Sequence, residues 1–96
     1  MASSVDYLQY VLDLLQDVPD VSYKKMMGEF LLYKNGVLFG GVYDDRFLLK
    51  KTPSNADLGL REELPYDGAK TMYLVDSEDP VAVRELVLKT IYSLCR

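Results

Sequence analysis

The stretch FLLYKNGVLF, residues 30–39, decides the fold because it sets two apolar runs on either side of Asn35-Gly36. An Asn-Gly pair favours a two-residue type I′ turn, since both turn positions need a positive φ angle. The stretch therefore predicts an antiparallel hairpin whose side chains alternate between two faces. The predicted cross-strand pairs are Tyr33 with Leu38, Leu32 with Phe39, and Phe30 with Gly41.

Further turn signals extend the hairpin into a larger sheet. Asp44-Asp45 can reverse the chain into another apolar run, so residues 24–51 are predicted to form three strands. Residues 55–64 are predicted to form a short helix, with Ser54 as its N-cap. The apolar residues in 71–75 predict a fourth strand.

Helices are predicted at both ends of the chain. Residues 4–17 place apolar side chains three and four positions apart, and Ser3 stands where a capping residue is expected. Pro19 ends this helix because its ring cannot continue the hydrogen-bond ladder. Asp79-Pro80 predicts the start of the last helix, with Asp79 as its N-cap, and Cys95 is expected near its end.

The predicted order of elements is helix, three strands, short helix, one or two strands, helix. This order indicates an α+β fold with two layers, an antiparallel sheet packed on the N- and C-terminal helices. At 96 residues, the chain is long enough for one domain, which is predicted to cover residues 1–96.

Both faces of the predicted sheet are apolar. One face is predicted to carry Leu31, Tyr33, Leu38 and Val42. The other is predicted to carry Phe30, Leu32, Val37, Phe39 and Tyr43. Two helices can cover only one face of a small sheet, so the second set is our candidate interface for a homodimer or a protein partner. The alternative is that sheet twist and the terminal segments cover this face.

Composition excludes several functions. The chain has 11 Lys or Arg, 15 Asp or Glu and a net charge of −4, which disfavours direct binding to nucleic-acid phosphates. It has no His, which removes His-based catalytic triads and imidazole zinc sites, and one Cys, which cannot form an internal disulfide. With no signal peptide and no long apolar stretch, a cytoplasmic location without membrane contact is expected. We predict no catalytic, cofactor or metal site.

Glu29 is a carboxylate that falls inside an apolar strand of the predicted sheet. A buried carboxylate needs a partner, and Lys25 or Arg46 could supply one. The alternative is that Glu29 lies in water at the sheet rim. A closed pocket around Glu29 and a cation would favour a small ligand-binding domain.

Three segments of the chain, residues 23–33, 41–50 and 65–70, resemble the TfoX N-terminal domain family. The family motif has a basic residue followed by Met-Phe-Gly-Gly, and here Met27 replaces Phe and Glu29 replaces the second Gly. The positions that match the family pattern are Lys25, Met26, Gly28, Tyr33, Gly36, Asp45, Pro65 and Tyr66. The chain looks like a short, stand-alone member of that family.

The resemblance implies a two-layer domain similar to the fold of secretion chaperones. It also implies a link to competence, because full-length members regulate DNA-uptake genes together with the cyclic-AMP receptor protein. Those members carry a second, helical domain. The resemblance brings no catalytic residues with it.

These observations lead us to expect a non-enzymatic protein-interaction module, acting in transcriptional regulation through protein contacts. Its expected partners are a second copy of the chain and a protein of the transcription machinery. The alternative function is a chaperone-like, peptide-binding dimer, which fold analogy alone suggests. A small ligand-binding domain is the less favoured alternative.

Overall fold

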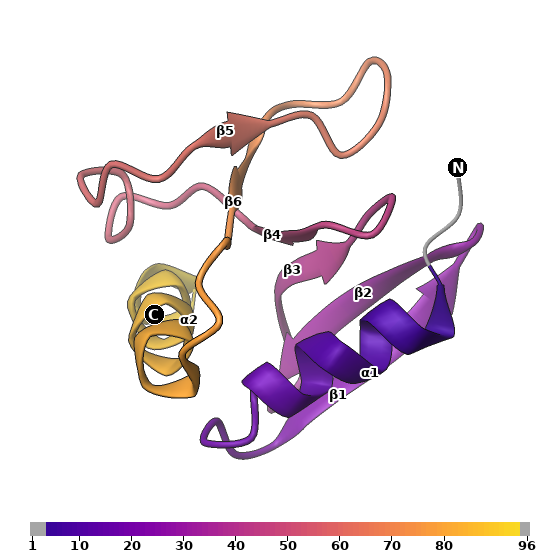
Figure 1. Ribbon diagram of the computed structural model, residues 1–96. Helices are drawn as coiled ribbons and strands as arrows, with labels where there is room; N and C mark the ends of the chain where they lie inside the picture. Colours follow the sequence, from indigo (N-terminus) through magenta and orange to yellow (C-terminus); the bar gives the residue numbers. More distant parts are fainter. Residues whose placement is uncertain (1–3, 95–96) are drawn as a thin grey trace.

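A computed structural model describes the protein from residue 4 to residue 94 (Figure 1). Ser3 and Cys95, which the sequence places near the two helix ends, lie outside this range. The elements in chain order are α1 (Val5–Leu14), β1 (Val21–Met26), β2 (Glu29–Lys34), β3 (Val37–Val42), β4 (Phe47–Leu49), β5 (Glu62–Glu63), β6 (Met72–Leu74) and α2 (Pro80–Leu94). Within residues 4–94, no helix is long and apolar enough to cross a membrane.

The strands form one antiparallel sheet in the order β1-β2-β3-β4-β6-β5. Both helices pack on the same face of this sheet, where α1 lies across β1 and β2 (Figure 1). The predicted α+β fold with two layers is therefore confirmed. β1 and β5 are the two edges of the sheet, and they differ in length, with six residues in β1 and two in β5.

The helix starts depend on capping side chains. The Ser4 hydroxyl, and not the predicted Ser3, accepts the Tyr7 N–H at 3.1 Å, and Ser4 N–H in turn donates to Asp45 Oδ1 at 2.8 Å. The β3–β4 turn thus holds the start of α1. At α2, Asp79 Oδ1 accepts the Val81 N–H at 3.1 Å, so the start predicted at Asp79-Pro80 is confirmed.

Two-residue turns join the first four strands. Asn35 and Gly36 have φ angles of 50° and 81°, which confirms the predicted type I′ turn. Asp44-Asp45 reverses the chain as predicted, again with positive φ at both residues. The third turn, Met27-Gly28, joins β1 to β2. Residues 24–51 therefore include parts of four strands, whereas three were predicted. β1 was missed because five of its six residues are exposed, so it lacks the apolar run that marks the other strands.

A β-bulge in β3 corrects the predicted register. Tyr33 lies opposite Leu38 as predicted, but Leu32 pairs with Gly40 and Phe30 with Val42. Phe39 is the extra residue, and every β3 residue after it pairs one position away from the predicted register. Because side chains alternate along a strand, this shift exchanges the faces of Val42 and Tyr43.

The candidate interface predicted from the sequence is largely the core. Phe30, Leu32 and Phe39 are buried against the helices, so the prediction that they form an open face is wrong. Val37 and Tyr43, the other two members, are half-buried. The bulge explains Tyr43, which moves to the opposite face from Phe30. The helices cover the Phe30 face because they supply a matching apolar layer that includes Val11, Leu14, Val83 and Val87.

The predicted helix at 55–64 is absent: a turn-rich loop takes the place of its first part, and β5 lies near its end. Asn55 in this loop is fully buried and hydrogen-bonded on every side. Its Oδ1 accepts the Thr52 N–H at 2.8 Å, while Nδ2 donates to the Lys50 carbonyl at 2.9 Å and to Thr90 Oγ1 at 2.8 Å. Asn55 therefore ties the loop to β4 and to α2, and its backbone follows those contacts rather than a helical path.

Replacing Asn55 with Ala is expected to lower the free energy of unfolding by about 2 kcal/mol, because buried polar groups of Thr52, Lys50 and Thr90 lose their partner. Urea denaturation followed by circular dichroism measures this loss. Asp57→Ala, an exposed change in the same loop, is the matched control and should cost less than about 0.5 kcal/mol. Equal losses for the two variants would show that the Asn55 hydrogen bonds do not stabilise the fold.

Candidate functional site

The sheet face opposite the helices, called here the open face, is incompletely covered. Leu31 and Tyr33 alternate with the core residues of β2, and their partners on β3 are Gly41 and Leu38. Leu31, Tyr33 and Leu38 are each half-buried. The sheet thus has two apolar faces, and the helices cover one of them, as predicted. The open face is the one that carries Leu31, Tyr33 and Leu38, not the predicted face that carries Phe30 and Leu32.

A ridge crosses the middle of the open face, and we call its residues Tyr43, Pro65 and Tyr66 the tyrosine ridge. Pro65 is buried, whereas Tyr66 is 62% exposed. The rings of Tyr43 and Tyr66 lie 6.3 Å apart at an angle of 49°. Gly41 makes room for the ridge, because a Cβ atom there would come within 2.7 Å of the Tyr43 ring.

Arg46 holds the tyrosine ridge on the sheet. Its Nη1 pairs with Glu63 Oε1 at 2.9 Å, and its Nε donates to the Tyr43 carbonyl at 3.2 Å. Its Nη2 donates a hydrogen bond to the Pro65 carbonyl at 3.4 Å. Both side chains of the Arg46–Glu63 pair are mostly buried, which makes the pair stronger than a fully exposed one. One guanidinium therefore links the β3–β4 turn, β5 and the segment that carries Pro65.

Glu29 is half-buried at the rim of the open face. Its Oε2 accepts the Asp44 N–H at 2.8 Å. The Arg46 guanidinium, one of the two cations predicted to pair with Glu29, binds Glu63. Glu29 thus helps to fix the β3–β4 turn, and it lines an open groove rather than a closed pocket.

The first of two grooves beside the ridge has a volume of about 880 Å³, and we call it the methionine groove. Its apolar residues are Met26, Met27, Leu31 and Leu64, together with the ridge. Its charged rim has the carboxylates of Glu29, Asp44 and Asp67 and the guanidinium of Arg46, whose charge is balanced by Glu63. Met26 and Leu64 are each 47% exposed, so the groove presents apolar surface to solvent within an acidic border.

The second groove, on the other side of the ridge, has a volume of about 670 Å³ and is called here the lysine groove. Leu38 and Met72 form its apolar part, and Lys50, Lys51 and Lys70 supply its charge. Lys51 Nζ pairs with Glu62 Oε1 at 2.8 Å, and this hydrogen bond holds the pKa of the Glu62 carboxyl below its usual range. The open face therefore has an acidic half and a basic half.

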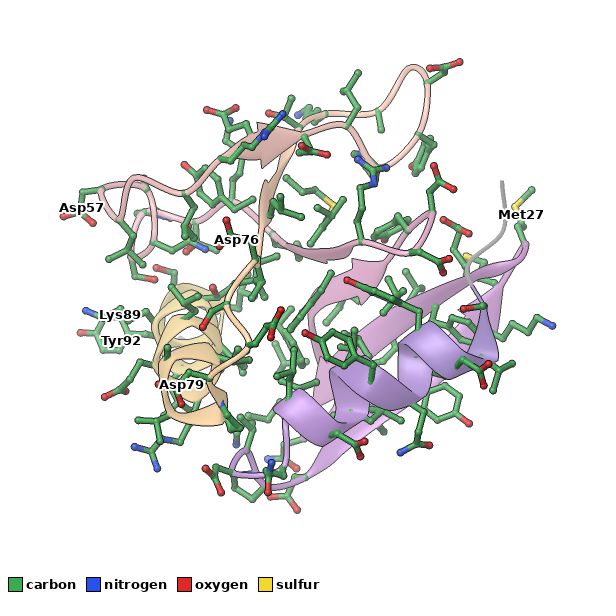
Figure 2. All side chains as sticks on the ribbon, viewed as in Figure 1. Met27, Asp57, Asp76, Asp79, Lys89 and Tyr92 are labelled. Carbon is green, nitrogen blue, oxygen red and sulfur yellow. The ribbon has the colours of Figure 1, made fainter. Side chains whose placement is uncertain are left out.

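Met27 stands out within the methionine groove because it is 96% exposed and has a φ angle of 52°. Figure 2 shows it at the tip of the β1–β2 hairpin, directed away from the sheet. A left-handed backbone costs an ordinary L-residue about 1–2 kcal/mol, and the side chain gains almost no burial in return. The equivalent position of the β2–β3 turn holds Asn35, which tolerates this conformation.

Met27→Asn is expected to raise the free energy of unfolding by about 1 kcal/mol, because Asn fits the first position of a type I′ turn. Thermal and urea denaturation measure the gain. The reverse exchange in the other turn, Asn35→Met, is the control and should lower stability by a similar amount. A Met27→Asn variant no more stable than the wild type would mean that Met27 is not strained.

Burial raises the pKa of the Tyr43 phenol, and Tyr66, Glu29 and Tyr33 raise it further. The pKa in the folded state therefore exceeds the value in the unfolded chain, so the favoured species is the neutral phenol. Its contribution to stability is complete below about pH 10 and is lost as the pH rises through the folded-state pKa. Urea denaturation at pH 8 and pH 11 should show a smaller alkaline loss for Tyr43→Phe than for the wild type. Equal losses would contradict this assignment.

The residues that match the family pattern fall into two groups. Met26, Tyr33, Pro65 and Tyr66 line the open face or its grooves. Lys25 also matches the pattern, but it pairs with Phe30, so its side chain lies on the opposite face of the sheet. Gly28, Gly36 and Asp45 occupy left-handed turn positions. Sequence reasoning missed the contributions of Met27, Leu64 and Arg46. The Met27-Gly28 pair before the apolar run of β2 was a signal for a turn that would expose Met27. The Arg46–Glu63 ion pair joins residues far apart in the sequence, so no local signal predicted it.

Comparison with known proteins agrees with this pattern. The model of the family described as the TfoX N-terminal domain matches residues 13–92. The chain is 32% identical over 78 residues to an uncharacterized 12.7 kDa protein in the trpE 5′ region of Spirochaeta aurantia, covering 79% of this chain and 68% of that protein. No solved structure matches the chain. The match to the family model includes β1, the turns and the tyrosine ridge, and the chain belongs to the TfoX N-terminal domain family.

Proposed function

We propose that this protein is a non-enzymatic interaction module whose methionine groove binds a protein of the transcription machinery. The observation that carries the proposal is the exposed apolar surface around the groove, where Met27 keeps a strained position although it contributes almost nothing to the core. Strain of this kind is retained where a residue serves a function rather than stability. The association of the family with competence regulators supports a role in transcription, which would act in the cytoplasm.

Charge defines the partner more narrowly. The rim carboxylates of Glu29, Asp44 and Asp67 favour a partner surface with Lys or Arg around an apolar anchor. DNA-binding regulators and polymerase subunits carry such basic surfaces. The same carboxylates repel nucleic-acid phosphates, so we propose contact with the protein and not with its DNA.

The test uses the full chain as bait, with two variants that each place a carboxylate on an exposed apolar residue. Met27→Glu changes the methionine groove, and Tyr92→Glu changes α2, on the far side of the molecule (Figure 2). The wild type and Tyr92→Glu should retain the same folded regulator or polymerase subunit. With that protein purified, Met27→Glu should weaken the affinity by about tenfold or more, as expected for loss of an anchor residue.

Three outcomes would overturn the proposal. Retention that Met27→Glu does not change would place the contact elsewhere. Retention of unfolded, extended chains only would support the chaperone-like alternative. Sedimentation that shows a dimer at micromolar concentration, disrupted by Met27→Glu, would assign the groove to a second copy of the chain.

A further inference from the structure

We propose that the edge of β1 accepts an extended acidic segment of a partner protein as a seventh strand of the sheet. This inference concerns the sheet edge and does not rest on the function proposed for the methionine groove. β1 is a regular strand of six residues without a bulge, and all its residues except Val21 are exposed. Strand edges of this kind bind extended chains through backbone hydrogen bonds.

The pairing register shows which backbone groups are available. Met26 and Glu29 flank a two-residue turn, so they form a hydrogen-bonded pair, and every second residue of β1 repeats this arrangement. The Asn35 N–H donates to the Asp20 carbonyl at 2.9 Å, which continues the same alternation beyond the strand. The N–H and C=O groups of Val21, Tyr23 and Lys25 therefore point away from β2. No backbone hydrogen bond from these three residues to another element occurs within residues 4–94.

Charge identifies the occupant. Lys24 and Lys25 are consecutive and exposed, so alternation places one ammonium group on each face of the sheet. A strand added at this edge meets both cations if it carries two consecutive acidic residues, one for each face. Within residues 4–94, neither lysine side chain forms an ion pair.

A second copy of the chain fits this edge poorly. Its acidic edge, β5, offers two residues, and their carboxylates already pair with Arg46 and Lys51 of the same chain. Pairing two β1 strands in antiparallel fashion would gather four lysines along one short seam, and like charges across neighbouring strands are destabilising. Lysines on an edge strand oppose this kind of self-association. The same two side chains that disfavour a second β1 favour an acidic strand.

The experiment uses the full chain labelled with ¹⁵N and a synthetic peptide, Val-Thr-Val-Glu-Glu-Val-Thr-Val. In the free protein, the Tyr23 and Lys25 amides should exchange rapidly with solvent, whereas the Lys24 and Met26 amides should already be protected by β2. Adding the peptide should slow exchange at Tyr23 and Lys25 by about tenfold or more, the effect expected of a formed hydrogen bond. A peptide with Lys-Lys in place of Glu-Glu should leave exchange unchanged.

Two variants separate the backbone contribution from the charge. Lys25→Ala removes the ammonium group but keeps the outward N–H, while Lys25→Pro removes both. Proline is tolerated at an edge position whose N–H faces solvent, so both variants should fold, which circular dichroism can verify. Lys25→Pro should bind the acidic peptide about tenfold more weakly than Lys25→Ala.

The proposal is overturned by any of three results. Equal binding by the two Lys25 variants would show that no strand is added at this edge. Unchanged exchange at Tyr23 and Lys25 at millimolar peptide would show that the edge has no affinity for an acidic strand. Protection of these amides that grows with protein concentration, without peptide, would assign the edge to a second copy of the chain.

Discussion

Phe39→Ala is expected to lower the free energy of unfolding by about 4 kcal/mol, the largest effect of any substitution considered for this protein. Phe39 is fully buried and is among the largest side chains of the core. It is also the extra residue of the β3 bulge. Removing its ring therefore leaves a cavity that β3 cannot fill by shifting its register. Urea denaturation followed by tyrosine fluorescence measures the change.

Leu38→Ala is the control for this prediction. Leu38 precedes Phe39 in β3 but lies half-buried on the open face, so its truncation should cost about 1 kcal/mol. A Phe39→Ala variant that is as stable as the wild type but no longer self-associates would support the sequence-based prediction that Phe39 lies in an interface. The burial of Phe39 predicts the opposite.

Gly40→Ala should have the second largest effect, a loss of about 3 kcal/mol. A Cβ atom at Gly40 would collide with the Leu48 carbonyl oxygen and lie 3.1 Å from the Leu49 Cα atom. Both are backbone atoms of the neighbouring strand, which pairs with Gly40 through Leu49, so no side-chain rotation can relieve the contact. The strands would have to separate at the centre of the sheet.

Gly59→Ala tests whether the loss at Gly40 is steric. Gly59 has a φ angle of 72° and open space around its Cα atom, so Ala there should cost about 1 kcal/mol through backbone strain alone. Thermal denaturation of the two variants gives the comparison. A cost at Gly40 no larger than the cost at Gly59 would mean that β3 and β4 separate easily at this point.

Local signals predicted the parts of the fold that depend on neighbours in sequence. The turn at Asn35-Gly36 was predictable because these two residues favour positive φ angles by themselves. The start of α2 was predictable because Asp79 caps the helix within its own first turn. The bulge at Phe39 was not predictable in this way. The apolar run in β3 continues through the bulge, so hydrophobicity carries no mark of the shift that exchanges Val42 and Tyr43.

The candidate site was predictable only in outline. The sequence showed that one apolar face would be left incompletely covered, and the alternation of side chains supports that conclusion. Choosing the face required the position of the bulge and the path of residues 64–70 across the sheet. Asn55 shows the same limit, because its hydrogen bonds to Lys50 and Thr90 come from tertiary contacts that override a local helical tendency.

The two edges of the sheet are unequal in length, so strand addition is favoured at one edge over the other. β1 offers six residues to an incoming strand, whereas β5 offers two, both acidic. A fibre that grows by strand addition needs two long sheet edges on each unit, and within residues 4–94 this sheet has one. Strand addition at β1 would therefore end after a single step, so the protein could form a finite complex with a partner without starting a polymer.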